Sequence, residues 1–242
     1  MEWRDEAIIL TVRRHGENGA ILSLMTERHG RHAGLVRGGQ SRRLKGVLQP
    51  GNRIAAGWRA RLEDHLGTLT VEPVASHAAA LMMDPGRLAA LSSALALVEA
   101  GLPEREAHPH VFESLAALMV ALEGEGWAET YVRWEVGLLA DLGFGLDLSA
   151  CAATGVTEDL TYVSPKTGRA VSSEAAAPYR DRLLPLPSFL KQRRGAAAPE
   201  DLAQALQLTG HFLAGQVFDL HGKPLPDART RLAEWLRRGR AA

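Results

Sequence analysis

Cysteine is almost absent from the chain, whose 242 residues contain a single one, Cys151. One thiol excludes an internal disulfide and a zinc site built from cysteines alone. No apolar run reaches the roughly 18 residues of a membrane span. Residues 1–6 are too acidic and polar for a secretory signal. We therefore expect a cytoplasmic protein that has no membrane among its partners.

Motifs of catalysis and of nucleotide binding are missing as well. The sequence has neither a phosphate-binding Gly-x-x-x-x-Gly-Lys loop nor a Gly-x-Ser-x-Gly nucleophile elbow. His29 and His32 span a turn with no thiol or carboxylate next to them in the sequence, whereas a metal site needs three or four ligands. The sequence predicts a protein that is not an enzyme and that uses neither a cofactor nor a metal.

The charges are balanced in number but not in position. The chain has 28 basic and 28 acidic residues. Counted along the sequence, residues 1–78 carry a net charge of +4, residues 79–181 of −9 and residues 182–242 of +5. This pattern indicates a basic N-terminal part, an acidic middle and a basic C-terminal part.

The strongest local signal is a basic stretch, residues 28–62, which contains nine basic residues and no acidic one. Like charges at this density repel one another unless something pairs them, and a one-signed surface is what a polyanion such as nucleic acid requires. The alternative is a solvated basic face. The residues that we predict to bind the nucleic acid are Arg31, Arg37, Arg42, Arg43, Lys45, Arg53, Arg59 and Arg61.

Short β-rich segments separated by glycine-rich turns predict a small barrel in residues 1–78. A Greek-key barrel of five strands suits this pattern, and the OB-fold is the common form that binds nucleic acid, although the periodicity alone also fits an SH3-like barrel. Trp58 is in phase with Ile54 and Ala56, which favours the barrel core over a base-stacking platform. The expected strands are residues 7–13, 20–26, 31–37, 53–62 and 66–74, with a basic loop or short helical turn at 40–49.

Beyond residue 78 the apolar residues recur with the period of a helix, which predicts a mostly α-helical domain over residues 79–242. Asp84-Pro85 is a helix start signal, and the glycines at 143 and 145 end a long helix. Residues 146–173 are expected to form an irregular or hairpin-like insertion. The predicted fold class is thus α+β. The expected helices are residues 85–101, 111–122, 127–142, 199–220 and 227–238.

Six segments form one ordered pattern along the chain: residues 3–12, 30–39 (GRHAGLVRGG), 48–52 (LQPGN), 131–143 (YVRWEVGLLADLG), 145–151 (GLDLSAC) and 162–169 (YVSPKTGR). Taken together, these segments resemble the RecO family of DNA-repair recombination mediators over nearly the whole chain. The resemblance implies an N-terminal OB-fold, a helical domain, and binding of single-stranded and double-stranded DNA with annealing of complementary strands. It also implies three protein partners: RecR, the C-terminal tail of single-stranded-DNA-binding protein and, indirectly, RecA, which the family helps to load.

Two features qualify what the resemblance implies. Some family members carry a four-cysteine zinc element, and here only Cys151 remains of it, so the insertion resembles a degenerate zinc finger that holds itself by packing. The C-terminal tail of single-stranded-DNA-binding protein is acidic in this family, so its binding site needs a cation beside apolar side chains. We assign this role to Arg133, Val136 and Leu139, while a surface ion pair of Arg133 with Glu129 or Glu135 is the alternative.

Two classes of function therefore remain in view. The first is a DNA-binding mediator, cytoplasmic and associated with the nucleoid. The second is a protein-interaction adaptor whose acidic helical domain is the main binding surface.

Overall fold

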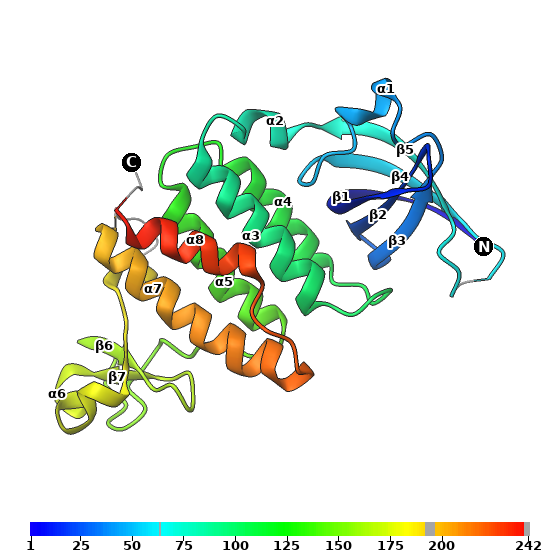
Figure 1. Cartoon of the computed structure of the whole chain (residues 1–242). Coiled ribbons are helices and arrows are strands. Elements are labelled where there is room, and N and C mark those ends of the chain that lie inside the picture. Colours follow the sequence, from blue (N-terminus) through cyan, green and yellow to red (C-terminus); the bar gives the residue numbers. More distant parts are fainter. Residues whose placement is uncertain (63, 192–196, 240–242) are drawn as a thin grey trace. The chain divides into compact units, whose positions relative to one another are not determined.

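The computed structural model describes residues 1–62, 64–191 and 197–239. The chain divides into two compact units, an N-terminal unit of Met1–Glu123 and a C-terminal unit of Gly124–Ala242 (Figure 1). Strands dominate the beginning of the chain and helices the rest, which confirms the predicted α+β class. The expected boundary at residue 78 follows this change from strands to helices, whereas the compact N-terminal unit also contains three of the described helices that come after the last barrel strand. That residues 1–78 form an independent domain remains a prediction.

The N-terminal unit is built on a closed barrel with the strand order β1-β2-β3-β5-β4. All neighbouring strands are antiparallel except β3 and β5, whose parallel pairing consists of Leu35 and Thr68 alone. A short helix, α1 (Arg42–Lys45), connects β3 to β4. This arrangement is consistent with the expected OB-fold. The strands are β1 (Glu2–His15), β2 (Gly19–Thr26), β3 (Gly30–Val36), β4 (Arg53–Arg59) and β5 (Thr68–Ala75).

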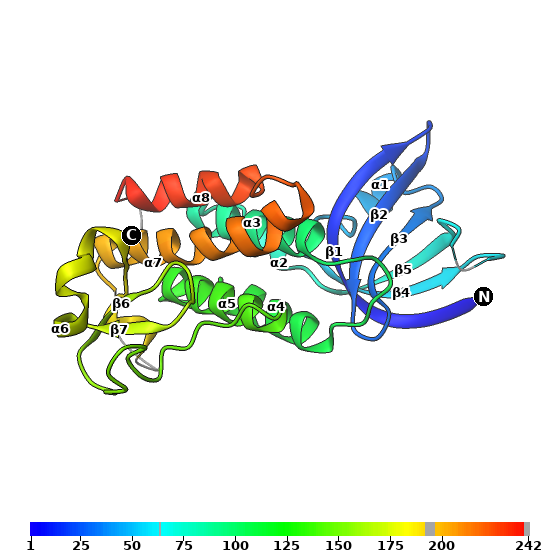
Figure 2. The ribbon, with the colours of Figure 1, turned by 90° about the horizontal axis from the view of Figure 1, so that it is seen from below.

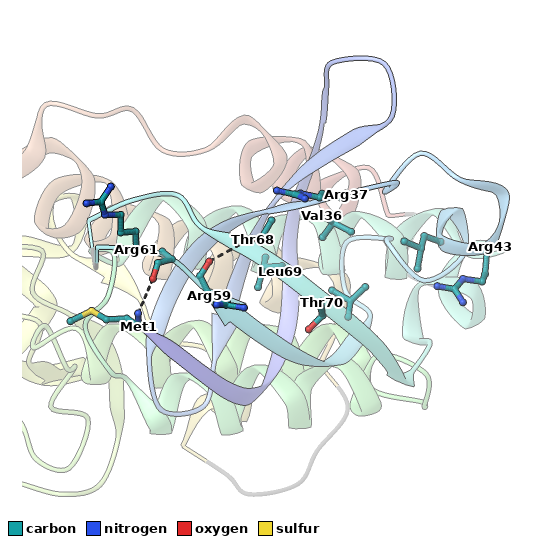
Figure 3. Close-up of a pocket in the computed structure, with 12 residues that line it drawn as sticks. Met1, Val36, Arg37, Arg43, Arg59, Arg61, Thr68, Leu69 and Thr70 are labelled. Atoms are coloured by element: carbon teal, nitrogen blue, oxygen red, sulfur yellow. Dashed lines mark hydrogen bonds between the residues drawn. The ribbon is translucent and has the colours of Figure 1, made fainter.

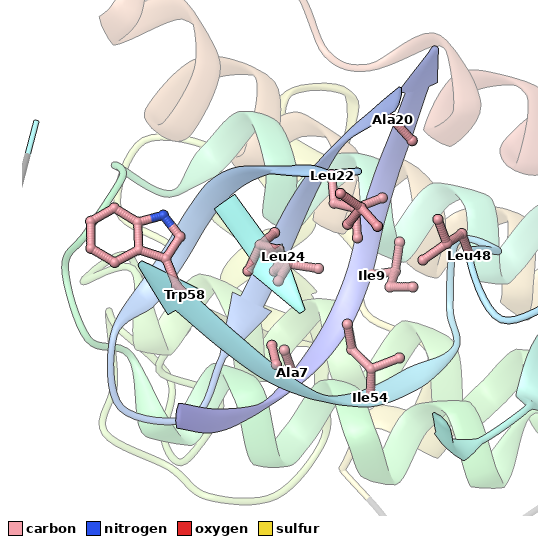
Figure 4. Close-up of a cluster of buried hydrophobic side chains, with 11 residues drawn as sticks. Ala7, Ile9, Ala20, Leu22, Leu24, Leu48, Ile54 and Trp58 are labelled. Carbon is pink, nitrogen blue, oxygen red and sulfur yellow. The ribbon is translucent and has the colours of Figure 1, made fainter. Parts of the chain in front are cut away.

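The barrel interior is filled by alternate residues of the strands, as the period of a β-strand requires (Figure 4). Trp58 is only 1 % exposed, and its indole nitrogen donates a hydrogen bond to the carbonyl of Leu66 at 3.0 Å. The interpretation of Trp58 as a core residue is therefore confirmed, and its ring is not a platform for bases.

Strands β1 and β2 are buried on both of their faces. Ile9 and Leu24 face the barrel core, while Ile8 and Met25, which point the other way, are also fully buried. Helix α3 contacts both strands and α4 contacts β2, so these helices cover the outer face. This packing explains why the compact unit extends to Glu123. Its helices are α2 (His77–Leu81), α3 (Pro85–Gly101) and α4 (Pro109–Ala121), and Asp84 caps α3 by accepting hydrogen bonds from two backbone N–H groups.

The connection between α3 and α4 pairs with the beginning of β3. Its backbone forms an isolated parallel bridge between Glu104 and Arg31, and the N–H of Arg105 donates to the carbonyl of Arg31 at 2.8 Å. Gly30 allows this approach, because a Cβ atom there would lie 1.8 Å from the carbonyl oxygen of Glu106 and its φ is +66°. The connection thus occupies the part of β3 that β5 does not reach.

The C-terminal unit is a helical layer with a small sheet. Helix α7 contacts both α5 and α8 (Figure 2). A fully buried polar network joins the three helices: Arg229 is paired with Glu135, which also accepts hydrogen bonds from Tyr131 and Thr209. The helices are α5 (Trp127–Asp141), α6 (Ser173–Ala176), α7 (Pro199–Phe212) and α8 (Asp227–Arg237), with shorter turns η1 (Ala177–Arg182), η2 (Ser188–Leu190), η3 (Leu213–Phe218) and η4 (Asp219–His221).

The insertion at residues 146–173 contains a hairpin, β6 (Leu160–Val163) with β7 (Ala170–Ser172), which β8 (Leu184–Pro185) extends to a three-stranded sheet. Cys151 is buried and accepts a hydrogen bond from the backbone N–H of Ser172 at 3.3 Å. Val163 is also buried, as expected of a segment held by packing. A likeness to a zinc finger is not seen, and within the described residues no three His, Cys, Asp or Glu side chains gather as metal ligands would. Among the described helices, none combines the length and apolar character needed to cross a membrane.

Candidate nucleic-acid interface

A groove of about 900 Å³ lies on the N-terminal unit, beside the sparsely paired boundary between β3 and β5 (Figure 3). Four arginines, two threonines and several aliphatic side chains line it, and no described lining residue is acidic. The lining residues are Met1, Val36, Arg37, Arg43, Leu44, Arg59, Ala60, Arg61, Thr68, Leu69, Thr70 and Val71.

The four arginines reach the groove from different elements. Arg37 directly follows β3, Arg43 lies on α1, Arg59 is the last residue of β4 and Arg61 begins the connection to β5. The two ends of this set are 24 positions apart in the sequence, and the closed barrel brings them together because β3 and β4 both neighbour β5. The backbone at this end is held by a hydrogen bond of 2.7 Å from the Met1 amino group to the carbonyl of Ala60.

Among the described residues, no acidic side chain forms an ion pair with any of the four groove arginines. All four are exposed, whereas the ion pairs found in this unit use other arginines. The nearest acidic neighbour in the β1–β4 ladder is Glu2, which is paired in register with Arg59 and is also exposed. A groove with four exposed guanidinium groups has the chemistry to hold the phosphates of a polyanion.

Three other cations of the basic stretch are neutralised within the unit. Arg28 pairs with Asp5 at 3.2 Å, and Arg53 pairs with Glu6. Arg31 pairs with Glu99 at 3.4 Å and Glu104 at 3.2 Å, and donates to the carbonyl of Leu102. The structure therefore does not bring the predicted residues Arg31 and Arg53 into the groove, and their guanidinium groups already have partners.

The remaining two predicted cations, Arg42 and Lys45, lie on α1 beside Arg43. Both are exposed, and neither lines the groove. The basic loop at residues 40–49 thus contributes one cation directly and places two more next to it. DNA contacts by Arg42 and Lys45 remain a prediction.

A cluster of aromatic rings lies at the β1–β4 pairing but not in the groove. The ring of Trp3 stacks on His29 at 4.4 Å between centroids and lies parallel to Trp58, and His32 meets both tryptophans edge-on. Burial lowers the pKa of His32 to about 4, and the charge of Arg105 adds to the effect. His32 is therefore neutral near pH 7 and adds no positive charge to the unit.

Asp5 holds the turn between β2 and β3. It accepts hydrogen bonds from the backbone N–H of Arg28 at 2.8 Å and lies 2.9 Å from Nδ1 of His29. Burial alone would raise the pKa of Asp5, but these hydrogen bonds and the charge of Arg28 outweigh it and lower the pKa below 3.8. No local sequence pattern indicates this role, because it depends on the β1–β2 register.

The residues predicted to bind a partner's tail lie on α5 in the C-terminal unit. The guanidinium of Arg133 donates to the carbonyl of Phe189 at 3.0 Å and lies over its ring at 5.3 Å. Val136 is half-buried, but Leu139 is fully buried and offers no surface to a ligand. Glu135, one of the two acids considered as a partner for Arg133, is instead bound to Arg229.

Comparison with known proteins identifies two family models along the chain. The model described as "Recombination protein O N terminal" matches residues 1–77, and "Recombination protein O C terminal" matches residues 82–224. Among similar proteins, the DNA repair protein RecO of Rhodospirillum centenum is 58% identical over 240 residues, which cover 98% of this chain and 96% of that protein. The DNA repair protein RecO of Caulobacter vibrioides is 52% identical over 237 residues, 98% of each chain. That of Rhodospirillum rubrum is 51% identical over 249 residues, 100% of this chain and 99% of the relative.

Proposed function

Because the chain belongs to the RecO family of DNA repair proteins, we propose that it is a non-enzymatic recombination mediator that binds DNA in the groove between α1, β4 and β5. The observation that carries this proposal is the set of four exposed arginines, Arg37, Arg43, Arg59 and Arg61, around one groove without a described acid. Their arrangement supports this groove as the proposed DNA-binding site.

The proposed activity is the binding of single-stranded and double-stranded DNA and the annealing of complementary strands. Two DNA strands repel each other through their phosphates, and the repulsion must be reduced before bases can pair. Cations that neutralise phosphates also release condensed counterions, which stabilises the complex at low salt. No bond is made or broken in this scheme, so the protein needs neither a nucleophile nor a cofactor.

Salt dependence of DNA binding tests the proposal. The affinity of the full chain for fluorescein-labelled oligo(dT) is measured by anisotropy between 50 and 200 mM NaCl, for the natural chain and for a variant with Arg37, Arg43, Arg59 and Arg61 changed to Gln. If each groove arginine neutralises one phosphate, the slope of log K against log salt falls by about 0.7 per arginine, or about 3 in total.

A matched control keeps the number of lost charges equal. Arg28, Arg53, Arg180 and Arg182 are changed to Gln; the first two are ion-paired and the last two lie on η1 of the other unit. We expect the control variant to keep most of the slope of log K against log salt that the natural chain shows. Equal slopes for the natural chain and the groove variant would refute the proposed site.

The proposal also includes specific protein partners. We propose that the chain works with RecR, contacts the C-terminal tail of single-stranded-DNA-binding protein and thereby helps RecA onto coated DNA, at the nucleoid. The proposed tail contact uses Arg133 and Val136 on α5, and the burial of Leu139 argues against a direct part for that residue. A tail peptide should bind the natural chain more tightly than an Arg133→Gln variant, in an assay without DNA.

The adaptor alternative has a distinct outcome in these experiments. If the groove variant anneals DNA as fast as the natural chain while tail binding persists, protein contacts and not the groove explain the activity.

A further inference from the structure

The groove offers cations and hydroxyl groups but almost no flat surface for a base. None of its described lining residues is aromatic. Val36 and Leu69 lie beneath it as part of the barrel core and are only 3 % and 4 % exposed. Leu44 and Val71 are half-buried and add aliphatic contacts alone. Proteins that hold single strands by their bases commonly stack them on aromatic rings.

The aromatic rings of the barrel are engaged elsewhere. Trp58 is buried in the core with its N–H bonded to Leu66, and Trp3 is stacked on His29. The outer face of β1 and β2, a second surface on which bases could lie, is contacted by α3, and Ile8 and Met25 on it are fully buried. The barrel thus has neither a ring in the groove nor an open β1–β2 face for bases.

Charged and polar groups of the groove match a sugar–phosphate backbone. Four guanidinium groups supply planar, charged donors that fit phosphate oxygens. Thr68 and Thr70 lie along β5 between Arg59 and Arg43 (Figure 3), and their hydroxyl groups donate to the carbonyls of Arg59 and Gly57, so the donors for phosphate are the guanidinium groups. Contacts of this kind fix the position of a strand without reading its sequence.

Resting on the proposed function, we propose that this groove recognises the sugar–phosphate backbone alone and leaves the bases of the bound strand outside, facing solvent. The ligand class is then a phosphodiester chain, with or without bases. A strand held in this way presents its bases to a second strand, so binding and annealing require no release step between them.

A strand without bases tests this inference. The full chain is titrated into three labelled oligomers of equal length: oligo(dT), an abasic oligomer of tetrahydrofuran phosphodiesters, and a methylphosphonate oligo(dT) that keeps the bases but lacks the charges. We expect the dissociation constants of the first two to agree within about threefold and the third oligomer to bind at least a hundredfold more weakly. Stacking of even one base typically contributes about five-fold or more in affinity, so several stacked bases would separate the first two clearly.

The outcomes separate the inference from the proposed function. Abasic binding more than about threefold weaker than oligo(dT), with the salt slope of oligo(dT) retained, overturns backbone recognition and leaves DNA binding intact. Failure of oligo(dT) itself to bind, or binding that is insensitive to salt, contradicts the proposed function instead. As a second readout, thymines of bound oligo(dT) should stay as reactive to permanganate as free ones, and protection of most of them would also overturn the inference.

Discussion

The buried pair of Arg229 and Glu135 makes a quantitative prediction for the C-terminal unit. Both side chains are almost fully buried, and Arg229 also donates to the carbonyl of Leu206 at 2.8 Å. Burial alone would lower the pKa of Arg229, but the charge of Glu135 offsets this and raises it, so the pair stays ionised. The substitution Arg229→Met keeps most of the volume but leaves a buried carboxylate without its cation, which costs about 3–5 kcal/mol.

Cys151 provides an assay for this unit alone. Its thiol is 1 % exposed and has no cysteine competitor in the chain, so its labelling by a thiol reagent reports opening of the structure around it. A loss of about 4 kcal/mol corresponds to roughly a thousandfold rise in the open population and in the labelling rate. The exchange of backbone amides on α7, measured at increasing urea concentrations, gives an independent value for the free energy of unfolding.

The double variant with Arg229→Met and Glu135→Gln distinguishes electrostatics from packing. Glu135→Gln removes the unpaired buried charge, and the neutral amide can still accept the hydrogen bond of Tyr131. We therefore expect the double variant to be more stable than Arg229→Met alone by about 2 kcal/mol. The prediction is wrong if Arg229→Met changes both the labelling rate and the exchange rate of the α7 amides by less than tenfold, or if the second substitution only adds to the loss.

The remaining predictions concern the N-terminal unit. Gly30→Ala should destabilise it by on the order of 3 kcal/mol, because the new Cβ meets the carbonyl of Glu106 and φ is positive; a melting temperature equal to the natural one contradicts this. Asp5→Asn should remove part of the acid sensitivity: the folded pKa of Asp5 is depressed, so its stabilisation is present above the unfolded pKa and is lost as pH falls toward the folded pKa. Urea midpoints of this variant should approach the natural values below pH 3.8 and fall short of them at pH 7; an unchanged difference across this range would count against the role of Asp5. Glu2→Gln should strengthen oligo(dT) binding at low salt, about as much as loss of one groove cation weakens it, since Glu2 is paired in register with exposed Arg59; unchanged affinity would show that Arg59 is not at the interface.

Sequence reasoning succeeded where one segment's own pattern decides the outcome. The phase of Ile54, Ala56 and Trp58 placed these side chains in the core, and all three are buried. Asp84 followed by proline marked the start of α3 correctly. Both depend on residues a few positions apart, whose geometry the backbone period determines.

The basic stretch shows where that reasoning ends. It has no acid of its own, yet Arg31 meets Glu99 and Glu104, which are 68 and 73 positions away. Arg53 meets Glu6 because β1 and β4 are neighbours in the barrel. Pairings at such separations depend on the packing of α3 against the strands, which no local pattern contains.

The buried ion pair of the C-terminal unit also joins residues that are far apart in the sequence. Arg229 and Glu135 are 94 positions apart, and each appears in the sequence as an ordinary charged residue of an amphipathic helix. The burial of Leu139, in contrast, follows from the apolar stripe of α5, so its assignment to a surface site conflicted with a pattern that was already visible.

The most direct test of the DNA-binding groove is a map of the interface on the intact chain in solution. Backbone amide resonances of the ¹⁵N-labelled protein are followed while oligo(dT) is added at low salt and are followed again as salt is raised. We expect shifts concentrated at residues 36–44, 59–61 and 68–71, which reverse with salt, and no comparable shifts on β1 and β2 beneath α3. Salt-reversible shifts confined to other surfaces, with the groove resonances unmoved, would contradict it.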